Sequence, residues 1–89
     1  MTMKIRKQAV AGTMQSSDLT VTVEPALSLD IQIESTVKQQ FEPLIRAAVE
    51  RVVARLGVSA VRVRVSDRGA LDYAIEARVE TALRRAAEV

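Results

Sequence analysis

The sequence predicts a small two-layer α+β domain, in which two helices pack on one face of an antiparallel-rich sheet. Some segments alternate apolar and polar residues with the two-residue period of a half-buried strand. Others repeat apolar residues at intervals of three and four, which is the spacing of one helix face. The chain has 89 residues, enough for one modest core, so residues 1–89 are expected to form a single domain.

Two alternating segments come first. Leu19, Val21 and Val23 share one face of the first segment, with threonines between them. The second segment repeats the pattern over residues 27–33, and its apolar face consists of Leu27, Leu29, Ile31 and Ile33. Branched apolar residues in strict alternation favour strands. We therefore expect these two segments to form an antiparallel pair with one solvent-exposed face.

A helix is predicted to follow and to end at Gly57, because glycine suits the left-handed residue that commonly terminates helices. Thr36 and Gln39 have the spacing of a capping box at its start. The apolar residues of one helical face are Val37, Phe41, Ile45, Ala48, Val49, Val52 and Leu56. Pro43 removes a backbone donor early in this segment. We therefore expect disturbed first turns and a regular helix from about Glu42.

A third strand and a second helix complete the predicted order of strand, strand, helix, strand, helix. Residues 61–66 alternate valine with arginine or serine, which predicts a strand with an apolar and a basic face. Residues 67–69 form a tight connection, and Asp67 is expected to cap the next helix. That helix is predicted over residues 70–87, with an apolar stripe of Leu71, Ile75, Val79, Ala82 and Leu83.

Composition excludes several classes of function. The chain has no Cys, hence no thiol nucleophile, and no His, the commonest general base and metal ligand. We therefore expect a protein that is not an enzyme, with no catalytic residues and no metal site. Lys and Arg number 13 against 11 Asp and Glu, and there is one Tyr, one Phe and no Trp. Without a basic stripe or aromatic partners, nucleic-acid binding is not expected.

Export and membrane insertion are not expected either. The basic residues near the N-terminus are not followed by the apolar run of a secretory signal. No stretch approaches the roughly 20 consecutive apolar residues that span a bilayer. The expected location is the cytoplasm, without a membrane partner.

Arg62, Arg64 and Arg68 are candidates for a docking or phosphate-binding site. Arg62 and Arg64 share the outer face of the third predicted strand, and Arg68 follows in the turn. Their three guanidinium groups could converge on a phosphate, an acidic partner or an RNA. The alternative is an ordinary solvated strand face whose charges oppose unwanted sheet pairing.

A polar segment before the first strong strand contains Ser16, Ser17 and Asp18. Residues 1–18 are predicted to be a flexible N-terminal segment and loop, with the Ser16 hydroxyl exposed, although residues 5–10 are also considered as an additional strand. From the residues alone, a modified serine and an ordinary surface turn are both open, because Ser and Asp are common in turns.

Several motifs occur in one order along the chain. Residues 4–10 read K-I-R-K-Q-A-V, residues 11–18 read A-G-T-M-Q-S-S-D, residues 37–41 read V-K-Q-Q-F and residues 67–72 read D-R-G-A-L-D. In this order and approximate spacing they resemble the acyl carrier (gamma) subunits of citrate lyase. The similarity covers essentially the whole chain, from Met3 to the last helix.

The resemblance implies a non-catalytic carrier subunit. In that family a serine bears phosphoribosyl-dephospho-coenzyme A through a phosphodiester bond, and the matching residue here is Ser16. Ser17 stands where some members have glycine, and mapping is needed to separate Ser16 from Ser17 as the attachment point. Ser17 and Asp18 are assigned to recognition or to the shape of the loop. The thiol of this phosphopantetheine-like arm would carry acetyl and citryl groups while citrate is cleaved to oxaloacetate and acetate.

The same resemblance implies partners. They are the alpha subunit (acyl transferase), the beta subunit (citryl lyase) and the transferase that attaches the prosthetic group, with Arg62, Arg64 and Arg68 available for docking or for cofactor phosphates. Alternatives within the carrier class are the carrier subunits of malonate decarboxylase and citramalate lyase. The alternative from another class is a small unmodified interaction or RNA-binding domain.

Overall fold

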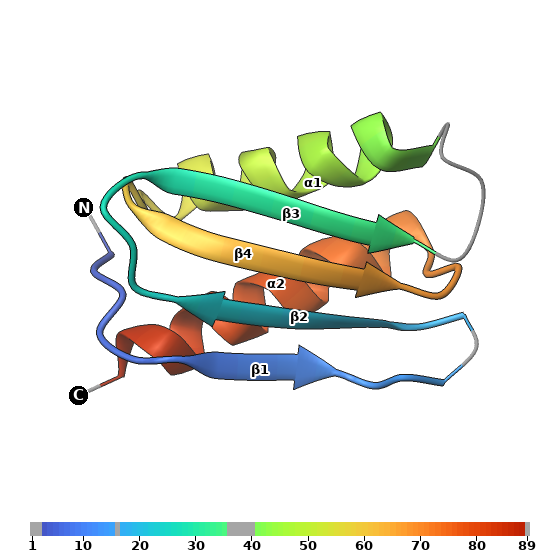
Figure 1. Ribbon diagram of the computed structural model, residues 1–89, viewed down its shortest axis with the longest axis horizontal. Helices are drawn as coiled ribbons and strands as arrows, with labels where there is room; N and C mark the ends of the chain where they lie inside the picture. The colour runs from blue at the N-terminus through green and yellow to red at the C-terminus, as the bar shows by residue number, and fades with distance from the viewer. Residues whose placement is uncertain (1–2, 16, 36–40, 89) are drawn as a thin grey trace.

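The computed structural model describes residues 3–15, 17–35 and 41–88 (Figure 1). Its elements, in chain order, are β1 (Ala9–Gly12), β2 (Leu19–Glu24), β3 (Leu29–Ser35), α1 (Glu42–Arg55), β4 (Val61–Asp67) and α2 (Asp72–Ala87). The strands form one mixed sheet in the order β1-β2-β4-β3. The predicted class, a small α+β domain with two helices on an antiparallel-rich sheet, is confirmed, since two of the three strand pairings are antiparallel.

The predicted pairing of the first two alternating segments is wrong. β2 and β3 do not pair, because β4 lies between them, antiparallel to β2 and parallel to β3. Burial gives the physical reason: Val61 and Val63 of β4 are 0% exposed, whereas Leu29 of β3 is 41% exposed. The more apolar strand takes the central position, and α1 provides the helical crossover that a parallel neighbour requires.

The ends of two strands also differ from the prediction. Leu27 is fully exposed and precedes β3, so it does not belong to the apolar face of that strand. The additional strand exists, but as Ala9–Gly12 rather than residues 5–10. Part of segment 1–18, for which the sequence predicts flexibility, is thus in the sheet. Ile5 is also buried, and the backbone amides of Arg6 and Lys7 donate to the carbonyl of Ala86.

α1 begins at Glu42, as predicted, with Pro43 in its first turn. At that position the missing N–H costs nothing, because first-turn amides have no partner within the helix. The capping box predicted at Thr36 and Gln39 lies outside the described residues. Phe41, expected on the buried face, is 41% exposed.

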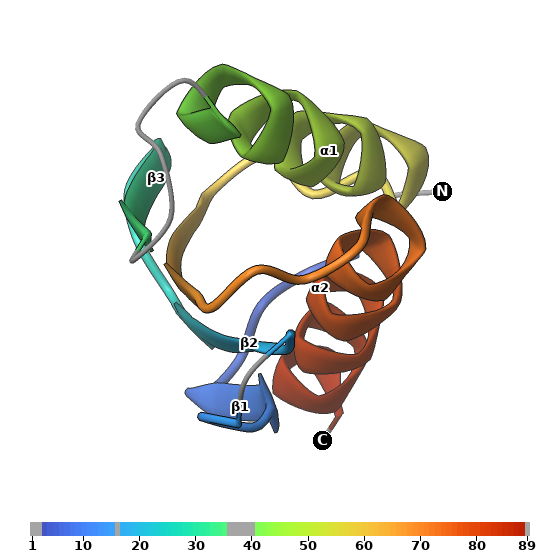
Figure 2. The same ribbon diagram turned by 90° about the vertical axis from the view of Figure 1, so that its right-hand side faces the viewer.

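α2 covers β1 and β2, and α1 covers β3, so both helices lie on one face of the sheet (Figure 2). The side chains buried between the layers include Leu19, Val21, Val23, Val49, Val52, Val61, Val63, Val65, Val79 and Leu83. Leu71, expected in the stripe of α2, is instead 59% exposed and precedes the helix. Asp67 does not occupy the N-cap of α2, although its Oδ1 accepts from the amide of Ala70 at 3.0 Å. No helix in the described part of the chain is long and apolar enough to cross a membrane.

Candidate functional site

The loop between β1 and β2 lies at one end of the sheet and contains the predicted attachment position (Figure 1). Gly12 ends β1 with φ +96°, a left-handed conformation that favours glycine. A Cβ atom at this position would lie 1.9 Å from the carbonyl oxygen of Leu19. Across the same gap the amide of Thr13 donates to that oxygen at 3.1 Å. Glycine is therefore required where the two strands separate into the loop.

Asp18 organises the loop through both carboxylate oxygens. The hydroxyl of Thr13 donates to Oδ2 at 2.6 Å, and the amide of Leu19 donates to Oδ1 at 2.8 Å. The guanidinium of Arg78, on α2, donates from Nε to Oδ1 at 3.3 Å and from Nη2 to Oδ2 at 3.2 Å. The Thr13 hydroxyl above all, then the Leu19 amide and Arg78, lower the pKa of Asp18 to about 2. This carboxylate is thus a structural anion that fixes the loop.

Ser17 and the turn after β4 are joined by backbone hydrogen bonds. The amide of Ser17 donates to the carbonyl of Arg68 at 2.8 Å, and the amide of Arg68 donates to the carbonyl of Asp18 at 2.9 Å. Ser17 has φ 62°, in the left-handed region. Glycine adopts that conformation without the steric cost that a side chain brings. Glycine would therefore fit at position 17 without strain.

Ser16 itself lies outside the described residues. Its described neighbours, Gln15 and Ser17, are both exposed, and the carboxylate of Asp18 is engaged by Thr13, Leu19 and Arg78. A large group attached within this loop would therefore meet solvent and would displace no core side chain. The surroundings fit a covalently attached prosthetic group, and the serine hydroxyls of the loop suit a phosphodiester linkage.

Two of the three candidate arginines, Arg62 and Arg64, meet at one carboxylate, that of Glu24. The guanidinium of Arg62 pairs with Asp30 at 3.2 Å and with Glu24 at 3.3 Å, and the hydrogen bonds that it donates to these two carboxylates raise its pKa. Arg64 also pairs with Glu24, at 3.2 Å. Arg68 lies in the turn six residues after Arg62, which is about 20 Å along an extended strand. Its backbone holds the loop between β1 and β2 (residues 13–18), here called the serine loop.

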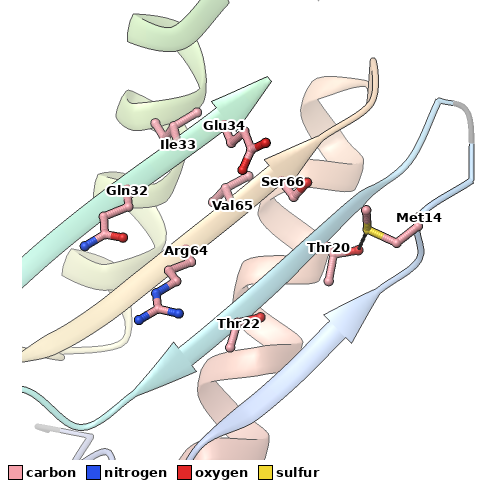
Figure 3. Close-up of a pocket in the computed structure, with 9 residues that line it drawn as sticks. All are labelled: Met14, Thr20, Thr22, Gln32, Ile33, Glu34, Arg64, Val65 and Ser66. Atoms are coloured by element: carbon pink, nitrogen blue, oxygen red, sulfur yellow. Dashed lines mark hydrogen bonds between the residues drawn. The ribbon is translucent and has the colours of Figure 1, made fainter. Parts of the chain in front are cut away.

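The open face of the sheet carries a shallow pocket of about 450 Å³ next to the serine loop (Figure 3). It is lined by Met14, Thr20, Thr22, Gln32, Ile33, Glu34, Arg64, Val65 and Ser66. Met14 belongs to the loop, and its sulfur accepts from the Thr20 hydroxyl at 3.0 Å. The single cation of the lining, Arg64, is already paired with Glu24, and Glu34 adds a negative charge. The pocket is polar without being an anion site.

Arg78 is the functional residue that the sequence did not indicate. It lies 60 positions after Asp18 and next to Val79, at the edge of the apolar stripe of α2. No spacing rule connects two residues so far apart, so only the packing of α2 on β2 brings them together. In the described part of the chain, no cluster of three or more Asp and Glu residues is placed to hold a metal ion.

The low pKa of Asp18 predicts how the loop responds to acid. An unfolded aspartate has a pKa of about 3.9. Since the folded value is lower, ionised Asp18 favours the folded state, and this contribution is complete above about pH 4 and is lost as the pH falls toward 2. NMR titration of the side-chain carboxyl carbon should place Asp18 at about 2 in the wild type.

Thr13→Val should raise the pKa of Asp18, because it removes the largest cause of the shift while keeping the shape of the side chain. Thr22→Val, on the open face of β2, is the matched control and should leave the titration of Asp18 unchanged. In parallel, the difference in free energy of unfolding between wild type and Asp18→Asn should shrink as the pH is lowered through this window. A pKa of about 3.9 for Asp18 in the wild type would contradict the hydrogen bonds to its carboxylate.

Comparisons with known proteins identify relatives along nearly the whole chain. The family model described as "ACP: Malonate decarboxylase delta subunit" matches residues 6–86. A citrate lyase acyl carrier protein from Haemophilus influenzae (strain PittEE) is 54% identical over 86 residues, covering 97% of this chain and 90% of the relative. Another from Albidiferax ferrireducens is 53% identical over 85 residues, covering 93% of this chain and 87% of the relative.

A solved structure has the same fold. It is a chain in the crystal structure of a Pseudomonas malonate decarboxylase hetero-tetramer in complex with malonate, and it superposes with a TM-score of 0.80 at 24% identity. The match covers 94% of this chain and 88% of that one. At this identity the likeness concerns the fold alone. The sequence relatives go further, and they show that the chain belongs to the family of citrate lyase acyl carrier proteins.

Proposed function

We propose that this chain is the acyl carrier subunit of citrate lyase, with phosphoribosyl-dephospho-coenzyme A attached to Ser16 through a phosphodiester. The observation that carries the proposal is the serine loop itself, an exposed turn at the end of the sheet that Asp18 and Arg78 hold in place. The chain has no Cys, so a thioester carrier of this sequence needs a thiol from a prosthetic group. When bound, that group supplies a terminal thiol for acyl groups.

The proposed role of the residues of this chain is to present the arm to the partner subunits, which carry out the catalysis. The carboxylate of Asp18 fixes the loop, the backbone of Arg68 ties it to the turn after β4, and the rigid two-layer body carries it. Attachment to a docked domain keeps an acyl group at an effective concentration in the millimolar range near the active sites of its partners. The proposed partners are the acyl transferase and citryl lyase subunits and the transferase that attaches the arm, all in the cytoplasm.

Arg62 and Arg64 are proposed to serve docking rather than binding of cofactor phosphates. Each already pairs with Glu24 on the open face of the sheet. Such half-exposed pairs contribute little to stability, so they remain available to a partner. Arg68 is exposed, and its backbone contacts the loop, so its side chain is proposed to contact the arm or a partner bound there.

Intact mass spectrometry tests the carrier role. The protein is purified from its own source, grown on citrate, and weighed before and after treatment with a thiol-reactive reagent. We expect a species heavier than the 9.7 kDa chain that gains one equivalent of reagent, although the sequence has no Cys. The bare mass from cells that contain the modifying enzymes would refute the carrier role and favour an unmodified interaction domain.

A carrier subunit of malonate decarboxylase is the second candidate, because the family model has that description and the superposed structure comes from that complex. Complementation separates the two. We expect the modified protein to restore activity to a citrate lyase that lacks its carrier and not to a malonate decarboxylase that lacks its own. The reverse result would transfer the proposal to malonate decarboxylase.

A further inference from the structure

An apolar groove lies between the start of α1 and the start of α2. Its floor is formed by Ile45 and Ile75, which are 3% and 4% exposed. Its rim consists of large apolar side chains that are well exposed: Phe41, Leu44, Leu71 and Tyr73. The groove has a volume of about 590 Å³, within the size range of small-molecule sites. Clustered exposed apolar side chains of this kind mark a binding surface.

The groove and the serine loop share the turn after β4. Asp67, Gly69 and Ala70 line one wall of the groove. Between them lies Arg68, whose carbonyl and amide hold Ser17 and Asp18. Figure 1 shows the β1–β2 loop, this turn and the start of α1 at the same end of the molecule. The groove is thus one turn of backbone away from Ser17, which follows the proposed attachment point in the sequence.

We propose that this groove binds the thiol-bearing end of the arm that the same chain carries, as a resting site between visits to the partner subunits. The inference rests on the proposed carrier function. A thiol or an acetyl thioester is largely apolar and suits a pocket lined by Leu, Ile and aromatic side chains.

Several features favour the chain's own arm over a partner subunit as the occupant. A volume of about 590 Å³ accommodates a small ligand, whereas a protein interface is a broad surface. Attachment beside the groove supplies the arm at a millimolar effective concentration, so even weak intrinsic affinity fills the site. By contrast, the open-face pocket near Met14 is polar and contains Glu34, which suits the thiol end poorly.

The chain provides built-in probes for this proposal. Its single Phe and its single Tyr, Phe41 and Tyr73, both line the groove, and there is no Trp. The ring signals of the protein's own aromatic side chains in a proton NMR spectrum therefore report on this groove alone. We expect the ring signals of Phe41 and Tyr73 to shift when the unmodified protein is compared with the modified, thiol-bearing protein. Intact mass, measured on the same samples, establishes how much of the protein carries the arm.

Alkylation of the thiol supplies an independent measurement. The modified protein is treated with iodoacetamide, and the rate is compared between wild type and Leu71→Ser. If the tethered arm occupies the groove about half of the time, the variant should react roughly twofold faster. Leu27→Ser is the matched control, because Leu27 is fully exposed and is not among the residues that line the groove. Both leucines are exposed enough for the folded state to tolerate serine, and circular dichroism of each variant checks this.

Each outcome decides the proposal. Shifted ring signals with faster alkylation of Leu71→Ser alone support it. An arm present by mass, with unchanged ring signals and equal alkylation rates, overturns it and leaves the carrier function intact. Ring signals that move only on addition of the partner subunits assign the groove to a partner instead, and signals that change with protein concentration assign it to a second copy of the chain. Absence of the added mass refutes the carrier function and this inference together.

Discussion

We expect Ser16→Ala to abolish attachment of the prosthetic group and Ser17→Gly to leave it intact. The first variant removes the hydroxyl that the phosphodiester requires. The second removes the neighbouring hydroxyl at a position with φ 62°, where glycine is favoured. Each variant is produced together with the modifying transferase and weighed intact. Ser17→Gly should fold with a stability within about 1 kcal/mol of wild type. Glycine relieves the steric strain of the left-handed conformation, and this gain offsets the greater conformational entropy that glycine gives the unfolded chain.

The two substitutions separate adjacent serines without disturbing the hydrogen bonds that shape the loop. Those bonds involve the backbone of Ser17 and the side chain of Asp18, and both variants retain them. Attachment that survives in Ser16→Ala and disappears in Ser17→Gly would move the linkage to Ser17. Loss of attachment in both variants would indicate that the transferase requires the hydroxyl groups of both serines.

Gly12→Ala is expected to destabilise the domain by about 2–5 kcal/mol, because two costs combine. The backbone has φ +96°, which disfavours any residue with a side chain, and the new Cβ would lie 1.9 Å from the Leu19 carbonyl oxygen. To relieve this clash, β1 and β2 must move apart at the point where the serine loop begins. Urea denaturation followed by circular dichroism measures the change.

Gly57→Ala is the matched comparison for this effect. Gly57 follows α1 and has φ +71°, so the substitution carries the conformational cost of a left-handed residue. We expect a loss of about 1 kcal/mol there. Equal losses at Gly12 and Gly57 would contradict the close approach of Leu19. A larger loss at Gly12, accompanied by weaker attachment of the prosthetic group, would show that the strand pair sets the shape of the loop.

The sequence predicts the elements of this fold better than their neighbours in the sheet. The alternation in residues 19–23 and 61–66 identifies β2 and β4, since a strand with one buried face must repeat every two residues. The same period contains no information about which strand lies alongside. The central place of β4 follows from its more complete burial and from the crossover through α1, and both depend on the assembled core.

The candidate site was predictable in its local part. The hydroxyl-rich segment with Asp18 is contiguous, and its turn-forming residues are visible in the sequence. The long-range part of the site was not predictable from the sequence, because Arg78 reaches Asp18 only when α2 packs on β2. Similarly, alternation placed Arg62 and Arg64 on one face of a strand but could not show the acids of neighbouring strands that pair with them.

The two anchors of the serine loop have a consequence for the order of events during synthesis. Arg68 and Arg78 are made long after Ser16, and a ribosome adds only about 5–20 residues per second. A nascent chain that ends before α2 has the serine, the aspartate and Arg68, but it lacks Arg78. The loop therefore reaches its final geometry only when the C-terminal helix has docked. An enzyme that recognises that geometry would modify complete, folded carriers and leave truncated chains unmodified. Attachment of the cofactor would then be restricted to chains that have already folded.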